Sequence, residues 1–496
     1  MSTLKKLASQ TAVYGLSQII GRFLNYLLVP LYTGIFAPEQ YGVVTEMYAY
    51  VTFFIVLLTY GMETAFFRFS EKSPDPNKVF GTATTSLLIS SGVFVILGLV
   101  FAQPVADMLR YPNHAEYIRW FVMILALDAI VAIPFARLRQ QNKPLKFATV
   151  KLLNIGINVG LNLFFLLGCP AILKSDGFAF MHGFVNTVYH PEMGIGYIFI
   201  SNLIASLITV PLLAKELSGI KYGLDKKLWK EMFMYALPLM VVGFAGMINE
   251  TLDRAILKYL LPRDTAMHDL GVYGAVYKLS MLMTLFIQAY RYAAEPFFFS
   301  YAKNKDSGKM YARIMNIFVV ICCVVFLSVT LFIDFFKEFI RDEAYWEGLH
   351  VVPILLLANM FLGIYINLSI WYKLGDKTNL GARISLMGAG VTIVLNFSLI
   401  PVWGYVGSAW ATLAAYFTMA VLNYLYGQKH YPIPYNLLKL FTYIGLSVLL
   451  YFVSRQATPY LPSTAAVYIL NSVLLLAFVG IAYFSERPNK IVNLPE

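Results

Sequence analysis

The sequence predicts an all-α integral membrane protein, and both its composition and its long apolar runs point to this fold class. Of the 496 residues, 59% are hydrophobic and only 13% are charged, whereas soluble proteins carry about 25% charged residues. A membrane-crossing helix needs about 20 mostly apolar residues, and apolar runs near this length recur along the chain. This excludes a water-soluble enzyme and leaves no room for a large soluble domain.

The apolar runs between charged or Pro/Gly-rich breaks predict about fourteen spans. They cover residues 11–35, 41–66, 82–102, 120–136, 152–171, 194–214, 232–261, 272–297, 314–333, 351–372, 384–402, 404–426, 440–454 and 464–484. The first run carries Arg22, Asn25 and Pro30 and has no small-residue cleavage pattern, so we expect a true span rather than a removable signal.

The distribution of Lys and Arg predicts the orientation, because cytoplasmic loops retain positive charge. Residues 137–151 contain five cations and no acid, whereas residues 334–347 contain two cations and five acids. We therefore expect both termini in the cytoplasm. The net charge of +11 is interpreted as a record of these cytoplasmic loops rather than as a nucleic-acid surface.

An internal repeat relates the two halves of the chain. An offset of 232 residues aligns Arg22 with Arg254 and Glu63 with Glu295, and the same offset places Glu46 opposite Lys278. Six predicted spans separate corresponding points, and an even number gives both halves the same orientation, as in parallel-repeat transporters. We expect two six-helix lobes around a central cavity, at residues 1–220 and 221–430, with two extra helices and the C-terminus at residues 431–496.

Charged residues inside the predicted spans are the candidates for function, because each costs about 3 kcal/mol at a helix centre. The cations expected to line the cavity are Arg22, Arg254, Lys278, Lys258 and Arg291. The acids expected in ion coupling or gating are Asp128, Glu46, Asp253, Glu63 and Glu295. The structural alternative is a set of internal salt bridges, with Glu63 paired to Arg68 and Glu295 paired to Arg291.

The sequence carries no motif for catalysis. It lacks a His-Glu-x-x-His pair, a phosphate-binding loop with Gly-Lys-Ser/Thr and a nucleophile elbow. The three cysteines, Cys169, Cys322 and Cys323, offer no metal-ligand spacing, and His182 and His190 are more simply solvated loop residues than metal ligands. We expect a transporter with no catalytic residue, no metal site and no cofactor.

Several stretches resemble the polysaccharide flippases of the multidrug/oligosaccharidyl-lipid/polysaccharide exporter superfamily. They are Ser17-Gln-Ile-Ile-Gly-Arg22, Pro38-Glu-Gln-Tyr-Gly42, Arg137-Leu-Arg-Gln-Gln-Asn-Lys-Pro144, Tyr273-Gly-Ala-Val-Tyr-Lys278 and Ala294-Glu-Pro-Phe-Phe298. The resemblance extends over essentially the whole chain, and its span count is similar to that of the lipid II flippase branch.

The resemblance implies a flippase of the bacterial cytoplasmic membrane that moves an undecaprenyl-pyrophosphate-linked oligosaccharide outward by alternating access, for O-antigen, lipopolysaccharide or capsule synthesis. It implies a cationic cavity for the pyrophosphate, best matched by Arg22, Arg254 and Lys278. It also implies coupling to protons or sodium, contact with membrane lipids, a monomer, and polysaccharide polymerase or assembly proteins as partners.

Two other functions remain open. An exporter of drugs or small organic cations from the same superfamily would depend on the buried acids more than on the arginines. A membrane polysaccharide polymerase or glycosyltransferase would be expected to carry a large external loop with catalytic residues, which the predicted spans do not leave room for.

Overall fold

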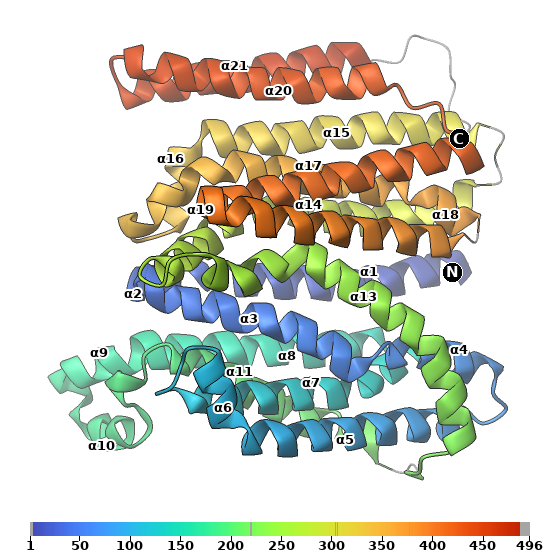
Figure 1. Ribbon diagram of the computed structural model, residues 1–496, viewed down its shortest axis with the longest axis vertical. Coiled ribbons are helices and arrows are strands. Elements are labelled where there is room, and N and C mark those ends of the chain that lie inside the picture. Colours follow the sequence, from blue (N-terminus) through green and yellow to red (C-terminus); the bar gives the residue numbers. More distant parts are fainter. Residues whose placement is uncertain (1–2, 219–220, 303, 305, 376, 487–496) are drawn as a thin grey trace. The chain divides into compact units, whose positions relative to one another are not determined.

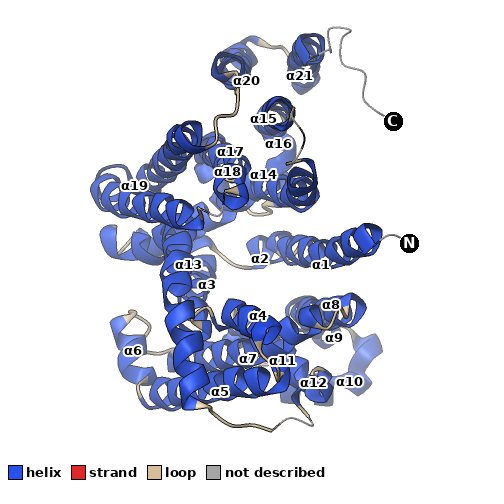
Figure 2. Ribbon diagram, turned by 90° about the vertical axis from the view of Figure 1, so that its right-hand side faces the viewer, coloured by secondary structure: helices blue, strands red, loops and turns tan. Residues whose placement is uncertain are grey.

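The computed structural model describes residues 3–218, 221–302, 304, 306–375 and 377–486. Within these residues every regular element is a helix (Figure 2). Residues 219–220, at the predicted lobe boundary, and residues 487–496, the end of the predicted cytoplasmic C-terminus, lie outside the described residues. The chain divides after Gly271 into two compact units.

The first unit is Met1–Gly271, and Figure 1 shows its helices. Its described residues form thirteen α-helices and the start of a fourteenth. They are α1 (Thr3–Tyr26), α2 (Val29–Ile35), α3 (Pro38–Thr59), α4 (Met62–Lys72), α5 (Pro76–Val100), α6 (Ala102–Met108), α7 (Ala115–Gln140), α8 (Pro144–Leu163), α9 (Cys169–Lys174), α10 (Ala179–Val188), α11 (Gly196–Leu212), α12 (Ala214–Leu217), α13 (Lys226–Leu260) and α14 (Ala266–Tyr301). A π-helical turn η1 (Phe164–Gly168) joins α8 to α9, and the short 3₁₀ turns η2 (Asp176–Phe178) and η3 (Pro191–Met193) flank α10.

In the second unit, Val272–Glu496, the residues that the structure describes form the rest of α14 and seven further α-helices. They are α15 (Ser307–Leu331), α16 (Ile333–Phe336), α17 (Val352–Leu368), α18 (Ile370–Leu374), α19 (Thr378–His430), α20 (Leu437–Ala457) and α21 (Thr464–Glu486), with 3₁₀ turns η4 (Lys337–Phe339), η5 (Glu343–Val351) and η6 (Thr458–Tyr460).

The predicted all-helical membrane fold is confirmed, and eleven of the described helical segments are long and apolar enough to cross a membrane. One of them, α19, bends at Gly404, whose φ of 59° interrupts the helix between the two spans predicted at 384–402 and 404–426. Gly196–Leu212 is a shorter apolar helix. The total of fourteen spans stays a prediction.

Two of the spans predicted as single helices are broken at a proline or at residues with positive φ. The segment 11–35 divides between α1 and α2, where Pro30 lies in the first turn of α2 and supplies no N–H to continue the preceding helix. The segment 41–66 divides between α3 and α4, where Tyr60 and Gly61 both have positive φ, 33° and 70°. A left-handed residue ends a helix because its backbone no longer follows the right-handed path.

The core of the first unit joins helices far apart in sequence. Met62 and Phe66 of α4 pack with Phe80 of α5 and Ile133 of α7, all fully or almost fully buried. The indole N–H of Trp229, at the start of α13, donates to the Ser86 hydroxyl at 2.7 Å, which ties α13 to α5. The long helix α13 therefore belongs to the same compact unit as α3, α4 and α5.

In the second unit, α17 and α19 pack along each other, and the α20–α21 hairpin packs on α15. The Trp371 indole N–H donates to Asn423 Oδ1 at 2.7 Å, and Asn423 in turn donates to the carbonyl of Tyr365 at 2.8 Å. Asn471 of α21 donates to the carbonyl of Leu331 at 2.6 Å, so the orphan carbonyl in the last turn of α15 is satisfied by the hairpin.

The beginnings of α3 and α14 approach so closely that only glycine fits at two positions. A Cβ on Gly271 would lie 1.8 Å from the Pro38 carbonyl oxygen, and one on Gly42 would lie 2.4 Å from the Met267 carbonyl oxygen. Both obstructions are backbone atoms, which cannot move aside as a side chain can. This close contact holds the beginnings of α3 and α14 together near the candidate site.

We expect Gly271→Ala to lower the melting temperature of the purified protein, because overpacking costs about 1–3 kcal/mol even against side chains. The matched control is Gly92→Ala in the interior of α5, where a Cβ meets nothing within 4 Å. The control should be neutral or slightly stabilising, since alanine favours the helix over glycine. Equal melting temperatures for the two variants would contradict the close approach.

Candidate functional site

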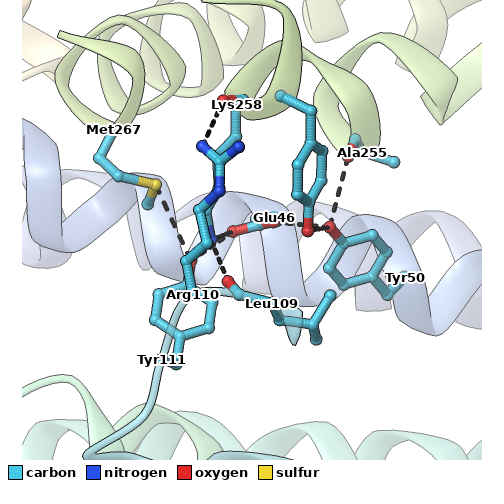
Figure 3. Close-up of polar contacts among 9 residues, drawn as sticks. Glu46, Tyr50, Leu109, Arg110, Tyr111, Ala255, Lys258 and Met267 are labelled. Atoms are coloured by element: carbon cyan, nitrogen blue, oxygen red, sulfur yellow. Dashed lines mark hydrogen bonds and ion pairs between the residues drawn. The ribbon is translucent and has the colours of Figure 1, made fainter. Parts of the chain in front are cut away.

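A buried ion pair joins α3 to α13 within the first unit (Figure 3). Lys258 Nζ lies 2.9 Å from Glu46 Oε2, and the two side chains are 4% and 0% exposed. Glu46 lies in the early turns of α3, and Lys258 lies in the last turn of α13. The structure thus brings together two of the charged residues that the sequence singled out.

Both charges have further partners. The Glu46 carboxylate accepts from the Tyr50 hydroxyl at 2.6 Å and from the Tyr111 hydroxyl. The Lys258 ammonium donates to the Leu109 carbonyl at 2.6 Å and lies 3.7 Å from the centroid of the Tyr111 ring. Burying a charge is tolerated when it is paired and hydrogen-bonded, and each member of this pair meets that condition.

The segment between α6 and α7 contributes Arg110 and Tyr111 to the surroundings of this ion pair. Arg110 adopts a left-handed conformation with φ 62°, which is uncommon for a residue with a side chain. Its guanidinium donates to the Lys258 carbonyl at 3.5 Å and lies 5.2 Å from the Tyr259 ring centroid. Burial, followed by the Glu46 carboxylate, raises the pKa of Tyr111 well above its ordinary value, so this phenol stays a proton donor.

We call Glu46, Tyr50, Tyr111, Lys258 and the Leu109 carbonyl the Glu46–Lys258 cluster. Sequence reasoning missed Tyr50, Arg110 and Tyr111. Tyr50 lies one helical turn from Glu46, which is a usable signal, but nothing in the sequence links the loop residues Arg110 and Tyr111 to α13. The cluster holds three separate segments together.

Partly buried hydrogen bonds also join α11 to α7 and to α8. The Ser206 hydroxyl donates to Asp128 Oδ1 at 2.9 Å, and the Asn154 amide donates to the Thr209 hydroxyl at 2.9 Å. Asp128, the predicted coupling acid of α7, is therefore engaged with a neighbouring helix.

The acids Glu63 and Glu295 are ion-paired, but not with the partners the sequence suggested. Glu63 pairs with Arg139 rather than Arg68, and Glu295 pairs with Lys373 rather than Arg291. Arg68 instead lies 4.2 Å from the ring centroid of Tyr235. The expected pairings were wrong because they favoured neighbours in sequence, whereas the actual partners come from other helices of the same unit.

Two further ion pairs tie segments of the first unit together. Lys146 binds the buried Glu216 at 2.5 Å, and Lys78 binds Asp225 at 2.6 Å. The Lys78 ammonium, with the Leu228 N–H, lowers the pKa of Asp225 below its ordinary value, so this carboxylate is ionised at neutral pH.

The remaining candidate cations lie on three helices. Arg22 is exposed on α1, and within the described residues it makes no ion pair. Arg254 on α13 lies 3.8 Å from Asp253 and donates to the Glu250 carbonyl. In the second unit, Lys278 is half-buried on α14, and Arg291 is exposed with its guanidinium 5.9 Å from the Tyr292 ring centroid.

Metal-binding geometry does not occur among the described residues, where no group of three or more His, Cys, Asp or Glu side chains could hold an ion. His182, expected to be a solvated loop residue, instead lies partly buried in helix α10, with Nε2 2.9 Å from the Ile172 carbonyl oxygen.

Solved transporter structures share this fold. The lipid II flippase MurJ, in an inward closed conformation, matches with a TM-score of 0.72 at 14% identity, over 95% of this chain and 99% of that chain. An inward-facing multidrug resistance transporter of the MATE family, in the MOP superfamily, matches with a TM-score of 0.63 at 12% identity, over 85% and 97%. The MATE multidrug transporter DinF-BH, solved as a complex with a ligand, matches with a TM-score of 0.60 at 18% identity, over 86% and 96%.

Sequence comparison gives a relative and a family. The uncharacterized membrane protein MJ1068 of Methanocaldococcus jannaschii is 22% identical over 464 residues, which is 86% of this chain and 85% of that protein. Residues 7–302, more than half of the chain, match the model for polysaccharide biosynthesis proteins. The chain is a multi-pass membrane protein that belongs to the polysaccharide biosynthesis protein family.

Proposed function

We propose that the protein is a flippase that moves an undecaprenyl-pyrophosphate-linked oligosaccharide across the cytoplasmic membrane for cell-surface polysaccharide synthesis. The observation that carries this proposal is the coincidence of two independent matches on one chain. Residues 7–302 belong to a polysaccharide biosynthesis family, and 95% of the chain follows the fold of a lipid II flippase. The first match supports the glycan and the second supports a lipid carrier.

The residues that we propose to bind the pyrophosphate are Arg22, Arg254 and Lys278, with Lys258 and Arg291 as further contributors. A diphosphate is too costly to move through hydrocarbon without compensating charges. Arginine suits it because the guanidinium is always charged and can bind phosphate oxygens in a bidentate manner. The exposure of Arg22 and Arg291 supports this role. Lys258 could contribute only after its ion pair with Glu46 has opened.

The proposed coupling and gating acids are Glu46, Asp128, Asp253, Glu63 and Glu295, with protons or sodium as the coupling ion. Glu46 is the best supported, because its carboxylate is the centre of the Glu46–Lys258 cluster. On the predicted orientation this cluster lies at the extracytoplasmic end of the first unit. Protonation of Glu46 would remove the charge that holds α13 and the α6–α7 segment to α3.

An exporter of organic cations is the second candidate, favoured by the fold likeness to a ligand-bound MATE multidrug transporter. Such an exporter would need carboxylates free to meet a cation. Here Glu46 is paired with Lys258 and Asp128 accepts from Ser206. These contacts make Glu46 and Asp128 less available to a substrate cation, whereas Glu250 on α13 is exposed.

We also propose a cellular location and partners for the protein. We place both termini in the cytoplasm and the protein in a bacterial inner membrane, acting as a monomer beside polysaccharide polymerase or assembly proteins. O-antigen, lipopolysaccharide and capsule glycans are the proposed substrate classes.

The experiment that tests the proposal depletes the protein from its host and assigns the leaflet of accumulated lipid-linked glycan with an impermeant sugar-modifying probe. A flippase predicts full-length glycan trapped on the cytoplasmic face, and the mass of that glycan identifies the sugar. Normal outward exposure with no trapped intermediate would favour the exporter.

For the proposed anion site, Arg22→Ala and Arg254→Ala should each abolish transport while protein abundance stays normal. Lysine at the same positions should restore part of the activity if charge dominates, and little if bidentate geometry is required. The control is Arg119→Ala, which removes an exposed arginine outside the predicted spans. Normal transport by both alanine variants would refute the central-cation model.

For the Glu46–Lys258 cluster, Glu46→Gln and Lys258→Met should each destabilise the protein by about 3–5 kcal/mol, since each leaves the other charge buried and unpaired. The double variant should recover much of that loss. Melting temperatures of the purified variants measure both effects.

The matched control for this cycle is Lys309→Met, which breaks the Lys309–Asp306 pair, whose side chains are 82% and 72% exposed. It should change stability little, because exposed ion pairs contribute at most about 1 kcal/mol. Additive losses in the double variant would show that Glu46 and Lys258 do not depend on each other.

A further inference from the structure

A cavity of about 300 Å³ lies in the second unit, between the end of α15, the turn η5 and the α20–α21 hairpin. Its walls include the apolar side chains of Leu331, Leu349 and Val467, and its polar lining includes Asp334, His350 and Arg455. The volume is at the lower end of the range for small-molecule sites, about 300–1,000 Å³. The cavity has no part in the proposed transport site.

The cavity lies at a membrane–water boundary, because four candidate spans end or begin at it. They are Ser307–Leu331, Glu343–Leu374, Leu437–Tyr460 and Thr464–Glu486. Exposed aromatic side chains, Phe335 and Tyr460, lie on the neighbouring turns, and aromatic residues are typical of the headgroup level of a bilayer. The molecules available to this cavity therefore include lipid headgroups.

The buried polar groups at the base of the cavity are hydrogen-bonded to one another. The Ser454 hydroxyl donates to Asn471 Oδ1 at 2.6 Å, and Asn471 Nδ2 donates to the Leu331 carbonyl at 2.6 Å. These buried bonds join α20, α21 and α15 at a fixed separation. The charged side chains at the rim of the cavity are therefore the groups that could bind a polar ligand.

The rim carries opposite charges on separate elements. Arg455, at the end of α20, is oriented by a hydrogen bond from Nη1 to the Tyr451 hydroxyl at 3.0 Å. Asp334, on α16, has a 58% exposed side chain and its Oδ1 lies 2.8 Å from Lys337 Nζ, so a ligand ammonium bound there would share the carboxylate with Lys337. A ligand that meets both side chains would have an anionic group and a cationic group a short distance apart.

We infer that this cavity binds the zwitterionic headgroup of one phospholipid, with the phosphodiester at Arg455 and the ammonium at Asp334. The acyl chains would lie along exposed apolar residues of the hairpin, including Phe452, Val473 and Leu476. A bound lipid fills the gap between the hairpin and the α16–η5 segment. It thereby joins the two helices outside the internal repeat to the rest of the second unit at the membrane surface.

The test measures binding of phosphatidylethanolamine to the full-length purified protein by native mass spectrometry, with phosphatidylglycerol as the lipid that lacks an ammonium. Arg455→Gln should weaken binding of both lipids about tenfold, the effect of losing one strong charge-assisted hydrogen bond. Asp334→Asn should weaken phosphatidylethanolamine alone and abolish the preference between the two. Arg119→Gln, which removes an exposed arginine in the first unit, should leave binding unchanged.

A second variant, Val467→Trp, tests the same cavity without removing Arg455. Val467→Trp fills the cavity while retaining both rim charges, and it should lose phosphatidylethanolamine binding. Wild-type binding by Arg455→Gln or by Val467→Trp would overturn the site. Free glycerophosphoethanolamine binding as tightly as the lipid would also overturn it, because the occupant would then be a soluble phosphorylated amine.

Discussion

The cost of an unpaired charge in an apolar environment is the constraint on which the arrangement of the first unit depends. Glu46 and Lys258 are both almost completely buried, and each is stable there only because the other is present. Their hydrogen bonds recruit Tyr50, Tyr111 and the Leu109 carbonyl, so α3, α13 and the α6–α7 segment meet at one point. The glycine contact between α3 and α14 allows the backbones to approach closely at the same end of α3. Electrostatics and steric fit therefore fix the same region.

Much of the fold could be predicted from the sequence, because apolar run length is read directly and helices are the simplest way to satisfy backbone groups in lipid. Pro30 was recognised inside its apolar run, whereas the break at Gly61 was missed, because no proline or change of composition marks it. The charged residues could be identified because a charge inside a membrane span is energetically costly, but their partners could not. Glu63 and Glu295 pair with Arg139 and Lys373, more than seventy positions away, and only the tertiary fold brings such residues together. Arg110 and Tyr111 lie in a connecting segment that carries no periodic signal.

The structure also separates two kinds of charge that the sequence grouped together. Lys258 is occupied by Glu46, whereas Arg22 and Arg291 are exposed on their helices. A substrate anion needs exposed cations such as Arg22 and Arg291. A conformational switch needs a buried pair such as Glu46 and Lys258. On the flippase proposal, the exposed Arg22 and Arg291 would bind the pyrophosphate together with the partly buried Arg254 and Lys278. The buried pair would determine when the first unit can rearrange. The lipid site inferred in the second unit would anchor the α20–α21 hairpin without taking part in either step.

Reconstitution tests the central claim most directly. The purified protein would be placed in vesicles that contain a polyprenyl-pyrophosphate oligosaccharide with a labelled sugar, and an impermeant reagent outside would modify only the exposed fraction. The account predicts that the protected fraction becomes accessible with the protein present, and that it stays protected with Arg22→Ala or without protein. Equal protection in vesicles with and without the protein, under an imposed ion gradient or membrane potential, would contradict the account.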